Sequence, residues 1–300
     1  MTTAAPSKPP PNGAAPKTPP PPPARSSSPA AAKVTAPKWG KMEAKFQPPR
    51  MIVNAVEGWG KTSLIAHSAK PLIVMAANET GYETLLGSGL VPSIDAAKVA
   101  TWAETLALFD ELIANNTGHQ TIGIDAMGGF ERMCHEHVCA RDFGGDWGER
   151  GFGSFQKGYE IAVNDWLQML VRLDKLRETR GTTVVLLSHC KVRTFKNPLG
   201  ADFDRYVSDL HDKTWAVTAK WADDVLFGNF FTVVETKKGG AAESLKKGKG
   251  IGGTQRVIYT QRRDAYDAKN RHNLPECIDI PDDASQSWPT LWNLIAGENA

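Results

Sequence analysis

The sequence predicts an α/β fold in which a mainly parallel, twisted sheet carries helices on both faces. Short apolar runs alternate along the chain with segments whose apolar residues recur at helical spacing. Residues 182–188 are almost continuously apolar, as expected of a strand buried on both faces of a parallel sheet. Residues 230–236 and 256–261 resemble two strands joined by a Lys/Gly-rich stretch, which adds a C-terminal hairpin.

Residues 1–47 are predicted to be a disordered Pro/Ala/Lys-rich basic tail. The first 50 residues hold 14 of the 20 prolines, with eight Lys/Arg and one acid. Their charge of +7 leaves the rest of the chain at −5, since the whole chain is +2. The tail has too little apolar surface to offset the entropy of ordering. We interpret it as a tether that adds nonspecific attraction to phosphates.

The composition excludes several classes of protein. No apolar segment follows the first basic residues, so no signal peptide is expected. No run of about 18 apolar residues is present, so neither a transmembrane helix nor a membrane partner is expected. Four cysteines do not suggest a disulfide framework. We therefore expect a cytoplasmic protein in which residues 48–300 form one domain.

The elements of that domain follow from the apolar pattern. Strands are expected at residues 51–56, 71–76, 120–125 and 182–188, and helices at 61–69, 101–115, 129–141, 159–180 and 215–221. A last amphipathic segment covers residues 288–295. Residues 142–158 are rich in glycine and aromatic residues and are predicted to form a loop, whereas residues 191–213 show no clear period.

The sharpest motif lies between the first strand and the first helix. Residues 55–62 read AVEGWGKT, which matches the P-loop pattern G-x-x-x-x-G-K-[ST] except for Ala55 at the first glycine. Backbone N–H groups of such a loop cradle phosphate oxygens, Lys61 reaches the β- and γ-phosphates, and Thr62 ligates Mg²⁺. The predicted nucleotide-binding residues are Glu57, Gly58, Trp59, Gly60, Lys61, Thr62 and Ser63. The alternative, a chance Gly-Lys-Thr turn, is disfavoured by the strand–loop–helix context.

Polar residues also end the other predicted strands. Asp125 occupies a Walker B position, where a carboxylate holds the magnesium of Mg-ATP. Glu79 is the candidate general base for the attacking water, the alternative being an acid in the first turn of a helix. His189 is placed to sense the γ-phosphate, unless it is a structural histidine. Because ligands bind where parallel strands end, we expect Glu79, Asp125, His189 and Lys61 to form one catalytic site.

Together these motifs resemble the RecA/RadA core of P-loop ATPases. The blocks GWGKTS at 58–63, DWGERGF at 146–152 and SHCKV at 188–192 resemble phage-encoded, RecA-related nucleotide-binding proteins of single-strand annealing and recombination. The resemblance covers about residues 50–280. It implies a RecA-like core, ATP and Mg²⁺ as cofactors, single-stranded DNA as a partner, and a homo-oligomeric ring or filament.

The same resemblance implies two DNA-contacting loops. Residues 143–158 hold Trp147, Arg150 and Phe152, and residues 191–213 hold Lys191, Arg193, Phe195 and Lys196. Cations interleaved with aromatic residues suit single strands, through phosphate neutralisation and base stacking. Several aspartates dilute the charge of the second loop, so an active-site lid or an oligomer contact stays open as its alternative.

Lys269 and Arg271 look like the Lys-x-Arg finger of hexameric RecA-type helicases, in which two cations reach the γ-phosphate of a neighbouring subunit. The alternative is a solvated basic turn. A second basic cluster comprises Lys237, Lys238, Lys246, Lys247 and Lys249. It is predicted to be a hairpin loop, with contact to DNA phosphates left open.

A zinc site is also suggested by the residue types of Cys134, His135, His137 and Cys139. On a helix, residues 134 and 137 share one face and residues 135 and 139 another, so helix packing is the default interpretation.

The sequence thus predicts a Mg-dependent ATPase that acts on single-stranded DNA in phage recombination or replication, in the host cytoplasm. The alternatives are a helicase or helicase-loader ATPase and a nucleotide-gated scaffold with little hydrolysis.

Overall fold

The computed structural model describes residues 1–4, 39–43, 45–235 and 249–297. The chain divides into two units, Met1–Ala44 and Lys45–Ala300, and all elements described below belong to the second. Most of the predicted tail and residues 236–248, with four of the five lysines of the second basic cluster, lie outside the described residues. No helix in the described part of the chain has the length and apolarity needed to span a membrane.

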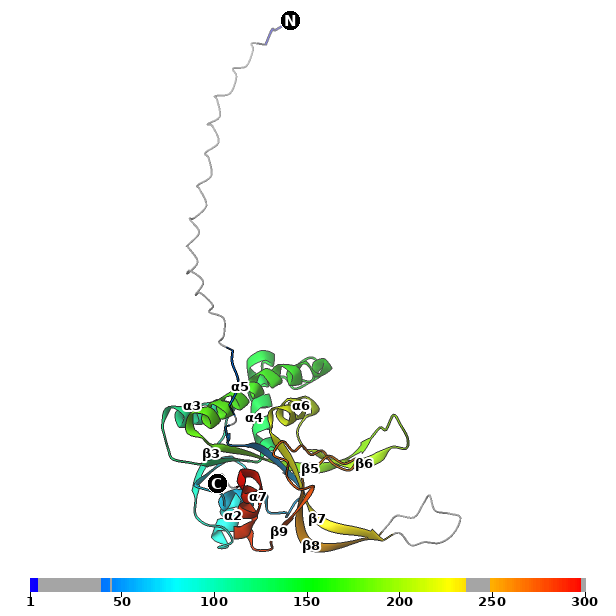
Figure 1. The fold of residues 1–300 in the computed structure, drawn as a ribbon. Helices are drawn as coiled ribbons and strands as arrows, with labels where there is room; N and C mark the ends of the chain where they lie inside the picture. The colour runs from blue at the N-terminus through cyan, green and yellow to red at the C-terminus, as the bar shows by residue number, and fades with distance from the viewer. Residues whose placement is uncertain (5–38, 44, 236–248, 298–300) are drawn as a thin grey trace, which may run out of the picture. The chain divides into compact units, whose positions relative to one another are not determined.

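The centre of the second unit is a mainly parallel sheet (Figure 1). Its strands are β1 (Arg50–Ala55), β2 (Pro71–Ala76), β3 (Asp95–Val99), β4 (Thr121–Asp125), β5 (Thr183–Phe195), β6 (Phe203–Ser208), β7 (Asp224–Glu235), β8 (Lys249–Tyr259) and β9 (Cys277–Ile280). The order is β3-β2-β4-β5-β1-β7-β8-β9. The strands from β3 to β7 in this order pair in parallel, whereas β8 and β9 pair antiparallel at one edge. The β5 strand thus lies between β1 and β4.

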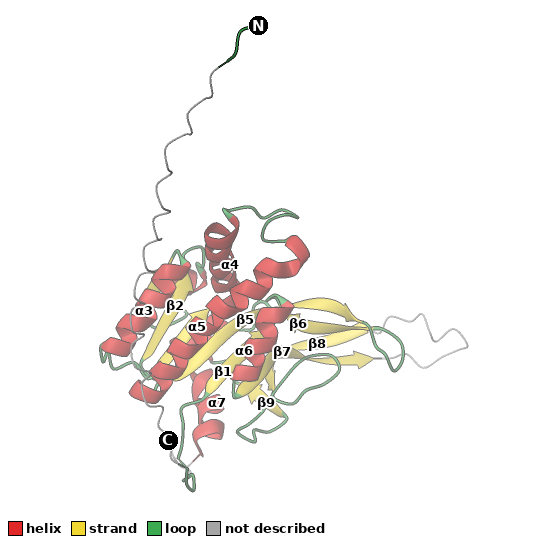
Figure 2. Ribbon diagram, turned by 90° about the horizontal axis from the view of Figure 1, so that it is seen from above, coloured by secondary structure: helices red, strands yellow, loops and turns green. Residues whose placement is uncertain are grey.

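Helices cover both faces of this sheet. One face carries α1 (Lys61–Ala66), α2 (Gly81–Gly87) and α7 (Ser287–Ala296), and the other carries α3 (Trp102–Ala114), α4 (Met127–Phe143), α5 (Lys157–Arg180) and α6 (Asp212–Trp221). Figure 2 looks onto the α3–α6 face. The short 3-10 helices η1 (Ser154–Gln156) and η3 (Ala284–Gln286) precede α5 and α7.

Each face of the sheet builds its own core. Side chains alternate along β1, so Met51 and Val53 join the core under α1 and α7, while Ile52 joins the core under α3 to α6. Because both faces are covered, five of the six residues of β1 are buried. On α5, Trp166, Leu170 and Leu173 form one buried stripe, as helical spacing requires.

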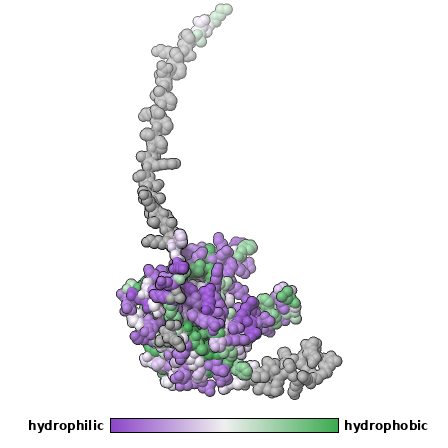
Figure 3. All heavy atoms as spheres, viewed as in Figure 1, coloured by the Kyte–Doolittle hydropathy of each residue, from purple (hydrophilic) through white to green (hydrophobic). Residues whose placement is uncertain are grey.

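The predicted α/β fold with its C-terminal hairpin is confirmed, and three differences matter for function. The β5 strand continues to Phe195 and pairs antiparallel with β6, so part of the segment that lacked a predicted period forms a hairpin. The α5 helix begins at Lys157, inside the predicted loop. The elements α2, β3 and β9 were not predicted. In Figure 3, most of the visible face is hydrophilic, with hydrophobic residues on the lower part of the body and at the outer end of the β5–β6 hairpin.

Candidate nucleotide site

The P-loop connects the end of β1 to the start of α1. Gly58 and Gly60 have φ of 72° and 103°, left-handed values that glycine adopts readily. Lys61 is 7% exposed and points back over the loop, where its Nζ donates to the carbonyl oxygens of Ala55 at 2.9 Å and Val56 at 3.3 Å. Burial lowers the pKa of Lys61. Among the described residues, the hydrogen-bond acceptors of this ammonium are these two neutral carbonyl oxygens, for which phosphate oxygens can substitute.

A glycine on the strand beside the P-loop leaves room for the side chain of Ala55, which replaces the first glycine of the motif. Gly228 of β7 lies opposite Ala55 in the parallel register, and Val56 N donates to Gly228 O at 3.2 Å. A Cβ at Gly228 would lie 2.7 Å from Ala55 Cβ and 2.8 Å from two ring atoms of Trp59. The departure at Ala55 is thus accommodated by the neighbouring strand.

Trp59 has a narrower role than the sequence predicts. Its side chain is fully buried, and its Nε1 donates to Val257 O at 3.1 Å. Only the main chain of this residue remains for phosphate contact, while the indole fixes the loop against β7 and β8.

A cluster of side-chain oxygens adjoins the loop. Thr62 Oγ1 donates to Asp125 Oδ2 at 2.7 Å, and Asp125 is 3% exposed. A Cβ at Gly81 would lie 3.4 Å from Glu79 Oε1 and 3.7 Å from Thr62 Oγ1, so these two oxygens border the same space. Burial raises the pKa of Asp125, and the hydrogen bond from Thr62 opposes that rise. Hydroxyl and carboxylate oxygens are the ligands that Mg²⁺ prefers, so these residues fit the predicted metal.

The predicted catalytic residues meet at one edge of the sheet. Lys61 follows β1, Glu79 follows β2 and Asp125 ends β4. His189 of β5 lies opposite Ala55 in the parallel register and is half-buried. The charges of Glu79 and Lys61 both influence the pKa of the Asp125 carboxylate, which Glu79 raises and Lys61 lowers.

Arg256 of β8 also contacts the P-loop and was not predicted. Its Nη1 donates to Trp59 O at 3.3 Å and lies 2.9 Å from where a Cβ on Gly60 would be. Its Nη2 donates to the carbonyl oxygens of Pro281 and Asp282 and to Ser287 Oγ at 3.2 Å. Burial lowers the pKa of Arg256. No local sequence signal links residues so far apart in the chain.

The first predicted DNA loop is only partly available to a ligand. Trp147 and Arg150 are exposed, whereas Phe152 is fully buried. The ring of Phe152 contacts those of His135, Phe143, Trp147 and Tyr159 at centroid distances of 4.9–5.7 Å. The prediction that Phe152 stacks on DNA bases is therefore wrong, because its ring holds the loop onto α4 and α5.

The second predicted DNA loop forms the β5–β6 hairpin, and Lys191, Arg193, Phe195 and Lys196 are all exposed there. The three cations have partners within the chain: Lys191 with Asp209 O at 3.2 Å, Arg193 with the Asp212 carboxylate at 2.9 Å, and Lys196 with the Asp202 carboxylate at 2.6 Å. Exposed ion pairs contribute at most about 1 kcal/mol. The cations can therefore exchange these partners for phosphates at little cost.

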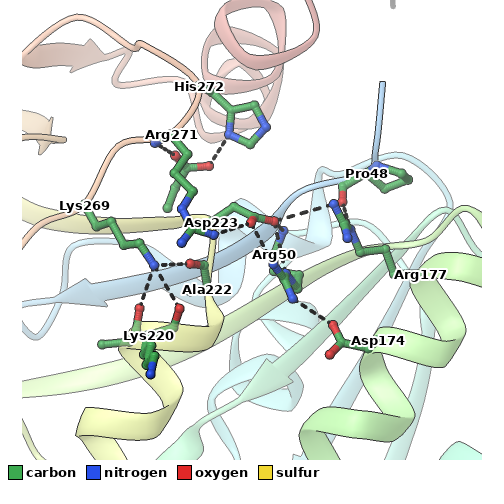
Figure 4. A network of polar contacts seen from close by, with 12 residues as sticks. Pro48, Arg50, Asp174, Arg177, Lys220, Ala222, Asp223, Lys269, Arg271 and His272 are labelled. Carbon is green, nitrogen blue, oxygen red and sulfur yellow. Dashed lines mark hydrogen bonds and ion pairs between the residues drawn. The ribbon is translucent and has the colours of Figure 1, made fainter. Parts of the chain in front are cut away.

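The predicted finger residues lie beside Arg50 and Asp223, near the amino ends of β1 and β7 (Figure 4). The P-loop of the same chain follows the opposite, carboxyl end of β1. Lys269 Nζ donates to the carbonyl oxygens of Ala219 and Lys220 at 3.0 Å and to that of Ala222, which caps α6. Arg271 Nη1 lies 3.2 Å from Asp223 Oδ1. Both cations are held by their own chain, and the finger role stays a prediction that requires Lys269 to leave α6.

Asp223 and Asp224 anchor this region. Burial opposes ionisation of Asp223, but hydrogen bonds and charge from Arg50 bring its pKa down to about 2. Asp224 is fully buried and bonds to Nδ1 of His272. The hydrogen bond to Asp224 raises the pKa of His272.

The cysteines and histidines that suggested zinc lie on α4. Cys134 and Cys139 are buried, and Cys134 Sγ donates to Ala162 O at 3.5 Å. Burial lowers the pKa of His135 to about 4, so its imidazole is neutral at pH 7 and packs against the Phe152 ring. His137 is half-buried on a different part of the helix surface.

Comparison with known proteins adds a family match. A family model described as an AAA domain matches residues 47–272, a segment that includes the P-loop, Glu79, Asp125 and His189. No curated protein sequence matches the chain. Among solved structures, the crystal structure of the RadB recombinase is similar, with 12% sequence identity and a TM-score of 0.42 over 80% of this chain and 90% of that chain.

Proposed function

We propose that this chain, which belongs to the AAA domain family and is a nucleotide-binding P-loop ATPase, hydrolyses Mg-ATP. In the same proposal it acts on single-stranded DNA in phage recombination or replication. The observation that carries the hydrolytic half is the 2.7 Å contact between Thr62 and Asp125, with the Glu79 carboxylate bordering the same space. Oxygen ligands for a metal and a candidate base therefore adjoin the phosphate-binding loop.

Each residue of this edge has a distinct task. Lys61 exchanges the carbonyl oxygens of Ala55 and Val56 for β- and γ-phosphate oxygens. Thr62 and Asp125 hold Mg²⁺, which neutralises charge developing on the phosphates. Glu79 accepts a proton from the attacking water. His189, which lies opposite Ala55 in the middle of β5, senses the γ-phosphate next to the β5–β6 hairpin.

The DNA-binding half of the proposal is supported by two exposed surfaces. One is the loop with Trp147 and Arg150, and the other is the β5–β6 hairpin with its cations and Phe195. Aromatic platforms beside cations bind single strands with little sequence preference and with strong salt dependence. We propose a homo-oligomer, ring or filament, in which Lys269 and Arg271 reach the nucleotide of a neighbouring subunit.

The test is ATP turnover at low salt with and without single-stranded DNA, beside a Lys61→Ala control that abolishes turnover. Stimulation by DNA supports the proposal, and turnover indifferent to DNA contradicts its DNA-binding half. Glu79→Gln separates hydrolysis from a nucleotide-gated scaffold. If Glu79→Gln retains ATP binding and loses turnover, the scaffold alternative fails, whereas unchanged turnover removes Glu79 as the base.

A further inference from the structure

A cavity of about 110 Å³ lies between the β5–β6 hairpin and α6. Its lining includes two aromatic side chains, two arginines and two aspartates: Phe195, Trp215, Arg193, Arg205, Asp212 and Asp267. A site for one water molecule needs about 10–15 Å³ of such volume, so the cavity has room for a group much larger than a single water molecule. Neither the P-loop nor the oxygen cluster of the nucleotide site contributes to this lining.

One buried hydrogen-bond donor in the lining of the cavity lacks an acceptor among the described residues. Arg205 is only 9% exposed, pairs with Asp267 at 2.5 Å, and stacks over the Phe195 ring at 5.5 Å. Its Nε is buried and has no hydrogen-bond partner among the described residues. Buried donors are normally paired, so an acceptor from a bound group or from water is expected here.

The charge of the lining favours a base over a phosphate. Arg193 pairs with Asp212 and Arg205 pairs with Asp267, so the cavity presents both donors and acceptors and the net charge of these four residues is close to zero. The aspartates would repel a phosphate. A nucleobase presents both donors and acceptors at its edge and a flat face for stacking, which matches this lining.

We propose that this cavity holds one nucleobase of the bound single strand, stacked against Phe195 and Trp215 with its edge toward the two arginine–aspartate pairs. The inference rests on the proposed function and assigns the hairpin a base-binding role beside its phosphate contacts. The cavity also borders the nucleotide edge of the sheet. Ser208 lines the cavity, and its Oγ lies 2.9 Å from Oγ of Ser188, the residue before His189.

The test compares two oligonucleotides of equal length and charge, oligo(dT) and one in which the central nucleotides are abasic, by fluorescence anisotropy. Stacking of one base on an aromatic side chain changes affinity by about tenfold. The wild-type protein should therefore bind the abasic strand about tenfold more weakly. Phe195→Ala should weaken binding of oligo(dT) about tenfold, leave binding of the abasic strand unchanged, and be rescued by Phe195→Tyr.

Phe231→Ala is the matched control, because Phe231 is a 49% exposed phenylalanine of β7 that does not line the cavity. It should leave the ratio between the two oligonucleotides unchanged. If the wild type binds both strands equally, DNA binding stands and the base cavity is overturned. A Phe195→Ala loss that is equal for both strands also overturns it. Binding of neither strand at low salt overturns the proposed function and this inference together. The comparison of the two oligonucleotides uses the wild-type protein, so it tests the base cavity even if a substitution disturbs the hairpin.

Discussion

Replacing Gly228 with alanine tests whether β7 provides the space that the P-loop motif lacks at Ala55. The new Cβ would lie 2.7 Å from Ala55 Cβ and 2.8 Å from the Trp59 ring. Both distances are shorter than 3.0 Å, and Cβ atoms in proteins essentially never make contacts that short. Neither neighbour can yield easily, because Ala55 is paired in β1 and the buried Trp59 is bonded to Val257. Such overpacking costs about 1–3 kcal/mol. For a domain of this size, that lowers Tm by about 2–12 °C.

Thermal unfolding followed by circular dichroism, with and without Mg-ATP, measures both effects of Gly228→Ala. We expect a lower Tm and a smaller increase on adding ATP, because the displaced P-loop binds phosphate less well. Gly253→Ala in β8 is the control, since the nearest atom to its new Cβ would be 3.8 Å away. Adding Ala55→Gly should restore part of the loss by removing the 2.7 Å contact. A Gly228→Ala protein with wild-type Tm and ATP affinity would refute this account.

Three further predictions concern residues outside the P-loop sequence. Arg256→Gln should raise the Kd for ATP about tenfold by calorimetry, with partial recovery in Arg256→Lys, because the Trp59 carbonyl loses its charged donor. Phe152→Ala should cost about 3–5 kcal/mol in urea unfolding, as for other buried phenylalanines, because its ring anchors the loop to α4 and α5. The hydrogen bond to Asp224 raises the pKa of His272, so protonated His272 stabilises the fold. That stabilisation is fully present well below the unfolded pKa of about 6.5 and is lost as pH rises through the raised pKa of the folded state, so the wild-type advantage over His272→Gln should shrink as pH rises above that unfolded value.

The nucleotide edge could be predicted from the sequence because its signals are local and its assembly follows from topology. The P-loop is one continuous stretch. Glu79 follows an apolar strand, Asp125 ends one, and His189 follows the apolar first half of β5. Parallel strands bring such ends to one edge, so the gathering of these residues required no knowledge of the helices.

The remaining site features depend on packing that composition does not encode. A phenylalanine in a glycine-rich segment is equally compatible with an exposed platform and with a buried anchor, and the rings around Phe152 decide the question. The outer half of β5 is exposed from Lys191 to Phe195, so no alternation of burial marks it as a strand. β3 is an edge strand with one buried residue, so its sequence also lacks the alternation of apolar and polar residues that marks a strand.

The contacts of Arg256 have a consequence for where this ATPase domain ends. The matched family segment stops at residue 272, yet three of the four oxygens that bind Arg256 come from Pro281, Asp282 and Ser287. Beyond them, Trp288 and Leu291 of α7 complete the core that contains α1. A fragment trimmed to the family boundary would therefore expose apolar surface beside the P-loop and leave Arg256 with one acceptor. The smallest stable ATP-binding fragment should extend through Ala296.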